Sequence, residues 1–278
     1  MNTLYISDLD GTLLNPDAEV SEYTASVLNQ LISDGIHFTV ATARTLASTS
    51  HILTPVNIKL PIVLMNGAAI YDANTKKYIH TEDLDNSKAI KIIETLQMHK
   101  LSPLMYSIHE HLMSTYFEAP ISSQMNKQID LRKTRYGMGF TETKSLKETC
   151  GNQTVYFSVL GPKESLDAAA IELRQIEGLQ VEFYRDVYSD TFWMEEIWFL
   201  EVFEGRASKE SAVRFLKEAF CFDKVVCFGD NLNDIPMFRV SDERYAVGNA
   251  RAELKEMADA IIGTNAEHGV AKWLEEKW

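Results

Sequence analysis

Short apolar runs recur along the chain, and each run ends in small or polar residues. They lie at residues 4–7, 38–41, 62–65, 225–228 and 245–247. Runs of this length and character are typical of parallel strands that are buried on both faces. Helical periodicity separates them, so the alternation predicts a doubly wound α/β domain.

The clearest of these helical patterns follows Ser21, a residue type that favours the N-cap position. Its apolar residues share one face, and Gly35 is expected to end the helix. The residues on that face are Ala25, Leu28, Leu31 and Ile32. We therefore predict that a helix covers the sheet directly after the first strand.

The pattern changes between about residues 82 and 194. Four segments alternate between apolar and polar residues and predict strands, while residues 166–176 predict a helix. The four segments are 104–108, 112–117, 154–160 and 181–184. We interpret residues 83–194 as an inserted α+β domain, and residues 1–82 with 195–278 as the core domain, which resumes at the apolar run 197–202.

Charge limits the classes of partner. The 278 residues include 27 Lys and Arg against 40 Asp and Glu, which gives a formal net charge of -13. Such a surface repels polyanions, so we expect no nucleic-acid partner. A small phosphorylated substrate would need a local concentration of cations at its site.

We expect a cytoplasmic protein with no membrane partner. The chain begins without a basic segment followed by a long apolar stretch, and it contains no run of about 18 apolar residues. Its cysteines, Cys150, Cys221 and Cys227, have no Cys-x-x-Cys spacing, so they indicate neither a zinc site nor a disulfide framework. The sequence pattern favours no particular oligomeric state.

Polar residues with chemical potential follow the predicted strands. In an open α/β sheet, ligands bind beyond the carboxyl ends of the strands. The residues found there are Asp8 and Asp10 after the first strand, Thr42 and Arg44 after the second, Asn66 after the third, and Asp230, Asn233 and Asp234 after the run 225–228. Three carboxylates at one sheet edge, from Asp8, Asp10 and Asp230, would repel one another without a cation, and hard oxygen ligands suit Mg²⁺.

Lys209 is in an unfavourable place for helix stability. Ser208 is a predicted N-cap, which makes Lys209 the first helical residue. A cation at this end opposes the helix dipole, whereas a bound phosphate would accept both the helix N-terminus and the ammonium group. The position therefore suggests a phosphate-binding role.

Each motif has a simpler interpretation when it is taken alone. The Asp8 segment could be a turn after a strand, and residues 229–234 could be a polar loop. An EF-hand calcium loop beginning at Asp8 fails because its sixth position is Leu13 instead of glycine, and because a strand precedes it. The joint placement of these motifs at strand ends favours a phosphoryl-transfer site.

The same residues resemble the haloacid dehalogenase superfamily of phosphatases, and within it the Cof-type subfamily. The resemblance rests on motifs in family order: Asp8-Leu9-Asp10-Gly11-Thr12-Leu13, Thr42, Asn66-Gly67-Ala68, Lys209, the loop 229–234, and a tail that includes Val247-Gly248-Asn249-Ala250. It implies a Rossmann-like core with a large α/β cap inserted between the second and third motifs.

The resemblance also implies the division of roles. Asp8 would be the nucleophile and would form an aspartyl-phosphate, and Asp10 would be the general acid and base. Mg²⁺ would be held by the side chains of Asp8 and Asp230 and by the backbone carbonyl of Asp10. Thr42, Lys209 and Asn233 would bind the phosphoryl oxygens. Asp234, Arg44 and Asn66 would support the site, with Asp234 serving the metal shell or orienting Lys209.

Three positions depart from the subfamily pattern. Ala43 replaces the usual glycine of Thr-Gly-Arg, Glu210 replaces the glycine after Lys209, where its carboxylate could pull on Lys209, and His268 replaces a commonly acidic residue. None of these changes removes a reacting group. In the inserted domain, His109 and His111 alternate along a predicted strand, where they could contact a substrate or face solvent.

We expect a magnesium-dependent hydrolase of small phosphomonoesters, such as sugar phosphates or related metabolites. Two alternatives stay open, namely a sugar phosphomutase-type phosphotransferase and a non-catalytic phosphometabolite-binding protein. The presence of Asp10 favours catalysis, because binding alone would not require it.

Overall fold

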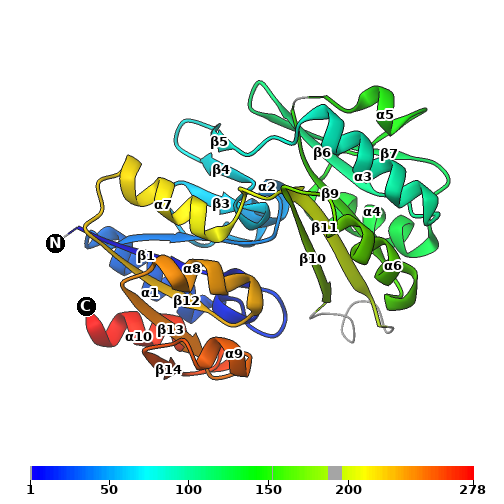
Figure 1. Ribbon diagram of the computed structural model, residues 1–278. Coiled ribbons are helices and arrows are strands. Elements are labelled where there is room, and N and C mark those ends of the chain that lie inside the picture. The colour runs from blue at the N-terminus through cyan, green and yellow to red at the C-terminus, as the bar shows by residue number, and fades with distance from the viewer. Residues whose placement is uncertain (1, 152, 187–195) are drawn as a thin grey trace. The chain divides into compact units, whose positions relative to one another are not determined.

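The computed structural model describes residues 2–151, 153–186 and 196–278 (Figure 1). These residues form two compact units. The first, called the core unit below, comprises Met1–His80 and Ser208–Trp278, and the second, called the inserted unit, comprises Thr81–Ala207. No helix in the described ranges combines the length and the apolar character needed to cross a membrane.

The core unit is built on a parallel sheet with the strand order β14-β13-β12-β1-β2. The strands are β1 (Thr3–Ser7), β2 (His37–Val40), β12 (Lys224–Gly229), β13 (Glu243–Val247) and β14 (Ala260–Ile262). In register, Ile6 lies opposite Cys227 on one side and Thr39 on the other. All three residues are buried, as expected for a sheet that is covered on both faces.

Crossover handedness places the helices on both faces of this sheet. The step from β1 to β2 through α1 (Glu22–Ser33) moves one way across the sheet, and the step from β12 to β13 through α8 (Ile235–Val240) moves the other way. Because parallel crossovers are right-handed, α1 and α8 cover opposite faces. The expected doubly wound fold is confirmed, and its topological switch point lies between β1 and β12.

The remaining core helices extend these two layers. Helix α10 (Gly269–Lys277) packs on α1, and α7 (Lys209–Ala219) packs on α8. Shorter helices are α2 (Leu46–Ile52) and α9 (Ala252–Lys255). Helix α1 begins as predicted, because the side chain of its N-cap, Ser21, accepts a hydrogen bond from the backbone N–H of Thr24.

The run at residues 62–65 departs from the expected parallel strand. It forms β3 (Ile62–Leu64), which pairs antiparallel with β4 (Ala69–Asp72) in a sheet that also holds β5 (Lys77–Thr81). A single parallel bridge from Val63 to Ala41 joins β3 to the end of β2. A short apolar run does not specify its pairing direction, and here the tight turn at residues 65–67 makes the hairpin.

The inserted unit has a sheet with the order β10-β11-β9-β6-β7-β8. Its strands are β6 (Leu104–His109), β7 (Leu112–Glu118), β8 (Thr141–Thr143), β9 (Thr154–Gly161), β10 (Leu179–Arg185) and β11 (Trp198–Glu204). Its helices are α3 (Asn86–Met98), α4 (Ser123–Tyr136), α5 (Leu146–Thr149) and α6 (Lys163–Leu173), of which α3 and α6 pack side by side (Figure 1).

One carboxyl group in this sheet is buried and has a raised pKa. Glu201 on β11 accepts a hydrogen bond from the Tyr156 hydroxyl at 2.7 Å. Burial raises the pKa of Glu201 to about 7, although the bonds from Tyr156 and Tyr184 lower it. The carboxyl group is therefore held in a setting that favours its neutral form.

Two expectations for the middle of the chain need correction. The run 197–202 was expected to return to the core, but it forms β11, which pairs along its whole length with β10 of the inserted unit. Apolar alternation marks a strand without showing which sheet it joins. His111 does not lie on a strand either, because β6 ends at His109 and His111 occupies the following turn with φ +65°. Both histidines are exposed.

Candidate active site

The Asp8 carboxylate lies at the switch point of the core sheet. Asp8 directly follows β1, and its backbone N–H donates to the Phe228 carbonyl oxygen at 3.0 Å, which ties it to β12. Its side chain is 7% exposed. Neighbouring parallel strands with helices on opposite faces leave a crevice at this position, so a ligand is expected here.

The Lys209 ammonium group bridges two of the aspartates. Its Nζ donates to Asp8 Oδ1 at 2.5 Å and to Asp234 Oδ1 at 2.6 Å, and its side chain is fully buried. Lys209 is the first residue of α7, as predicted, and the Ser208 and Ser211 side chains form a capping box around it. Two carboxylates compensate the unfavourable placement of this cation at the helix N-terminus.

The Glu210 carboxylate does not pull on Lys209. It accepts from the Arg214 guanidinium group at 2.9 Å, one turn further along α7. This is an ordinary i,i+4 ion pair on a helix surface. The departure from the subfamily pattern at this position therefore leaves the contacts of Lys209 with the aspartates unaffected.

Asp234 organises the loop after β12. While its Oδ1 accepts from Lys209, its Oδ2 accepts from the backbone N–H groups of Asp230 at 2.9 Å and Asn231 at 3.0 Å. Charge-assisted bonds of this kind are among the stronger hydrogen bonds in proteins. Both oxygens of Asp234 are thus engaged by the protein itself.

The Asp230 carboxylate packs against the first loop. Its Oδ1 accepts from the Thr12 hydroxyl at 2.8 Å. Gly11, with φ +79°, is required at this approach, because a Cβ there would lie 2.5 Å from Asp230 Oδ2. Thr12 was not singled out from the sequence as a site residue, although it belongs to the Asp-x-Asp-Gly-Thr motif.

The Asp10 carboxylate pairs with the Arg44 guanidinium group. The guanidinium group donates from Nη2 to Asp10 Oδ1 at 2.5 Å and from Nε to Oδ2 at 2.7 Å. The two side chains are 24% and 16% exposed, so this bidentate pair is only partly open to solvent. The loops after β1 and β2 are thereby held together.

Three further predicted residues lie around the same sheet edge. Thr42 is fully buried, and its hydroxyl oxygen accepts from the backbone N–H of Arg44 at 3.1 Å. The Asn66 backbone N–H donates to the Thr42 carbonyl oxygen at 3.0 Å, and Asn233 Nδ2 donates to Asn66 Oδ1 at 3.2 Å. The structure therefore links the residues that follow β2, β3 and β12.

Charge balance in this cluster is unfavourable for the aspartates. Burial raises the pKa of Asp8 well above its usual value, Lys209 opposes that rise, and Asp234, Asp230 and Asp10 add to it. Burial likewise raises the pKa of Asp230 to about 7, and Asp234 adds to that rise. Burial alone would lower the pKa of Lys209, but its two carboxylate partners raise it.

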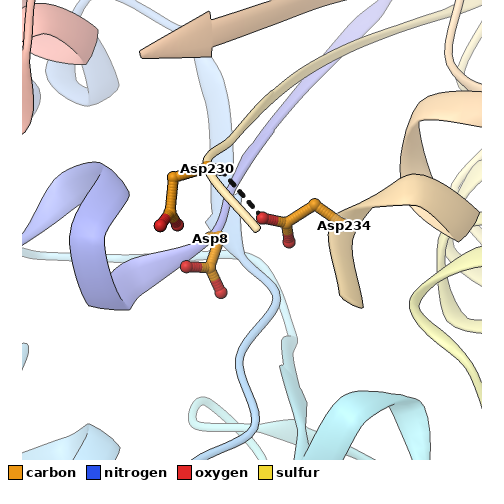
Figure 2. Close-up of side chains that lie close together, drawn as sticks. All are labelled: Asp8, Asp230 and Asp234. Atoms are coloured by element: carbon orange, nitrogen blue, oxygen red, sulfur yellow. Dashed lines mark hydrogen bonds between the residues drawn. The ribbon is translucent and has the colours of Figure 1, made fainter. Parts of the chain in front are cut away.

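The residues present fit a divalent cation. Four carboxylates, from the three aspartates of Figure 2 and from Asp10, face two cations, so two negative charges are left over. One oxygen from each of Asp8, Asp230 and Asp234 lies within 4.8 Å of the others. Because both oxygens of Asp234 already accept hydrogen bonds from the protein, Asp8 and Asp230 are the two side chains better suited to hold Mg²⁺. The Asp10 side chain is paired with Arg44, so the group of Asp10 that could bind the cation is its backbone carbonyl.

A buried acidic cluster with a bridging lysine, at the switch point of a doubly wound sheet, is a site suited to anion and metal chemistry. Comparison with known proteins defines the class. Residues 5–274 match the family model of the haloacid dehalogenase-like hydrolases. The chain belongs to this family, which confirms the resemblance inferred from the sequence and, with it, the enzyme class, a phosphatase of the haloacid dehalogenase type.

Individual relatives are similar over nearly their full lengths. Phosphatase YwpJ of Bacillus subtilis is 28% identical, with 96% of this chain and 97% of the relative covered. Pyridoxal phosphate phosphatase YbhA of Escherichia coli is 26% identical, with 96% and 95% covered. Among solved structures, a haloacid dehalogenase-like hydrolase from B. subtilis superposes with a TM-score of 0.80 at 26% identity, over the whole of both chains.

Proposed function

We propose that the protein hydrolyses small phosphomonoesters in a magnesium-dependent reaction through an aspartyl-phosphate at Asp8. The observation that carries this proposal is the buried Asp8 carboxylate, which Lys209 holds at 2.5 Å beside Asp230. A buried carboxylate fixed by an ammonium group is oriented for attack and shielded from competing water.

In the first step, a carboxylate oxygen of Asp8 attacks phosphorus, and the bond between phosphorus and the leaving oxygen breaks. Asp10 gives its proton to that leaving oxygen. The bidentate contact with Arg44 holds the Asp10 carboxyl group in place for this transfer.

In the second step, Asp10 takes a proton from water, whose oxygen attacks phosphorus and releases Asp8 and inorganic phosphate. Asp10 acts in this step as the general base. When bound by Asp8, Asp230 and the Asp10 carbonyl, Mg²⁺ supplies the positive charge that allows a phosphate dianion to approach this acidic site.

The phosphoryl oxygens would be bound by Lys209, Thr42 and Asn233. Lys209 is the most strongly supported of the three, since its ammonium group already contacts the proposed nucleophile. Asp234 and Arg44 would be positioning residues, which hold Lys209 and Asp10 respectively. Asn66 supports Asn233 through its side chain.

The substrate class proposed is a phosphorylated small metabolite. One relative named above is a pyridoxal phosphate phosphatase, and at 26% identity it supports the phosphomonoester class without extending that compound to this chain. A screen of sugar, cofactor and nucleotide monophosphates would identify the substrate.

The test is phosphate release from an aryl phosphate, with Mg²⁺ and with a chelator. Asp8→Asn should lower kcat on the order of 10³-fold or more, since the amide is no nucleophile. Asp17→Asn, at an exposed aspartate of the same segment, is the matched control and should leave kcat unchanged. Chelator-insensitive release, or turnover retained by Asp8→Asn, would contradict the proposal.

The same assay separates the two alternatives. Formation of an isomeric sugar phosphate without free phosphate would indicate a phosphomutase-type transferase. Tight binding of phosphorylated metabolites with no release would indicate a binding protein.

A further inference from the structure

Two asparagines late in the chain hold the loop that carries Asp10. Asn249 Nδ2 donates to the Gly11 carbonyl oxygen at 2.7 Å, and Asn249 Oδ1 accepts from the backbone N–H of Asn265 at 3.0 Å. Asn265 Nδ2 then donates to the Leu14 carbonyl oxygen at 2.8 Å. A chain of three hydrogen bonds therefore connects the segments after β13 and β14 to the loop after β1.

The peptide groups held in this way are those that set the site. The Gly11 carbonyl belongs to the peptide plane between Gly11 and Thr12, and the Thr12 hydroxyl holds Asp230 Oδ1 at 2.8 Å. Gly11 has the dihedral angles φ +79° and ψ -7°, and because glycine has no side chain, its own sterics do not hold the backbone in this conformation. A tilt of this plane would move Thr12 on one side and the Asp10 carbonyl on the other.

The segment that includes Asn249 also contacts the second carboxylate loop. The backbone N–H of Arg251 donates to the Asp230 carbonyl oxygen at 2.8 Å. Within three residues, the chain thus contacts the backbone of the Gly11 loop and the backbone of Asp230. These contacts add to the pairing of β1 with β12 and to the Thr12–Asp230 bond in holding together two loops that lie more than 200 residues apart in the sequence.

We propose that Asn249, together with Asn265, is a positioning residue that sets the affinity of the site for a divalent cation. The inference rests on the proposed function, because that function assigns the cation to Asp8, Asp230 and the Asp10 carbonyl. Neither asparagine touches the reacting atoms. Partners outside the ligand shell that orient metal ligands commonly change metal affinity by 10-fold to 100-fold.

The experiment compares Asn249→Ala with a matched control on α1. Asn29 makes the same pair of bonds far from the carboxylates: its Nδ2 donates to the Pro55 carbonyl oxygen at 2.8 Å, and its Oδ1 accepts from the Asn57 backbone N–H at 2.8 Å. Binding of Mn²⁺ is measured from the electron paramagnetic resonance signal of the free ion, with Mg²⁺ as competitor. Thermal unfolding is recorded in parallel.

Asn249→Ala should weaken Mn²⁺ binding by about 10-fold, whereas Asn29→Ala should leave it unchanged at a similar loss of thermal stability. Asn265→Ala should weaken Mn²⁺ binding in the same direction as Asn249→Ala. Asn249→Asp keeps the acceptor for Asn265 but turns a carboxylate oxygen toward the Gly11 carbonyl, so it should weaken binding at least as much as the alanine. The Mg²⁺ concentration for half-maximal phosphate release should rise in parallel, and excess Mg²⁺ should restore turnover.

Unchanged Mn²⁺ affinity in Asn249→Ala, with only a stability loss matching Asn29→Ala, would overturn the inference and leave the asparagines a purely structural role. The proposed function fails separately. A protein that binds Mn²⁺ in an Asn249-dependent way yet releases no phosphate would refute hydrolysis and support the positioning role.

Discussion

Replacing Lys209 with methionine should destabilise the protein strongly and in a pH-dependent way. The ammonium group is fully buried and lies 2.5 Å from Asp8 Oδ1 and 2.6 Å from Asp234 Oδ1. Methionine fills a similar volume without charge, so the change isolates the electrostatic contribution. It leaves two buried carboxylates beside Asp230 with no cation among them.

The magnitude follows from these distances. With an effective dielectric constant of about 20, Coulomb's law gives a gross attraction of roughly 6 kcal/mol for each contact. Desolvation of the buried ions offsets much of it, and breaking a buried ion pair by removing one partner costs about 3–5 kcal/mol. We expect a loss in this range in a metal-free buffer at pH 8.

At lower pH the loss should be smaller. The pKa of Asp8 is already raised by burial, and removal of Lys209 takes away the contact that opposes that rise. When folding raises the pKa of an acid, the protonated acid favours the folded state, and this contribution to stability is lost as the pH rises. The destabilisation by Lys209→Met should therefore be smaller at pH 5 than at pH 8.

Urea unfolding with a chelator present measures these changes. Lys217→Met on the same helix is the matched control: Lys217 pairs with Asp242 at 3.1 Å, is 34% exposed, and should cost less than about 1 kcal/mol. The double variant Lys209→Met/Asp234→Asn should recover at least about 1.5 kcal/mol relative to additivity, because it removes one unpaired charge. A Lys209 effect no larger than that of Lys217, or additivity within about 0.5 kcal/mol, would refute the electrostatic account.

Two further predictions concern pH and a close backbone approach. The pKa of Glu201 is raised from 4.5 to about 7, so the natural protein loses stability as the pH rises across that interval. The free energy of unfolding of Glu201→Gln, measured in urea, should therefore increase by roughly 2 kcal/mol relative to that of the natural protein between pH 5 and pH 8. A difference between the two proteins that does not change with pH would contradict this prediction. Gly67→Ala puts a Cβ 2.1 Å from the Ser208 carbonyl oxygen and should lower the free energy of unfolding by about 2–4 kcal/mol. The control, Gly35→Ala, has φ +106° but no atom within 4 Å of the new Cβ, and should lower it by about 1 kcal/mol. Equal shifts in Tm for the two variants would contradict the clash at Gly67.

The sequence was sufficient to identify four of the five strands of the parallel core sheet, β1, β2, β12 and β13, and the loops that follow them, whereas β14 was not predicted. Buried parallel strands are short continuous apolar runs, and every such strand ends at the same edge of the sheet. Asp8, Thr42 and Asp230 could therefore be expected close together without any knowledge of their contacts. The N-cap at Ser208 was equally readable, because capping depends on residues adjacent in the chain.

The tertiary structure decided which side chains meet. That Asp10 pairs with Arg44, that Asp234 shares Lys209 with Asp8, and that Asn249 holds the Gly11 carbonyl all depend on loops brought together by strand register. The pattern of apolar positions carries no information on such partners. The expected metal ligands, with Asp10 contributing its backbone carbonyl, stay a prediction, and the pairing of the Asp10 side chain with Arg44 is compatible with it.

The strand β11 shows the same limit at the level of the fold. Its apolar residues correctly predicted a strand but assigned it to the core, and only its pairing with β9 and β10 places it in the inserted unit. Periodicity is a property of neighbouring residues, so the sequence alone determined the elements and the chemistry available at their ends. Pairing depends on residues far apart in the chain, so only the tertiary structure decided the partners of each carboxylate and the boundaries of the units.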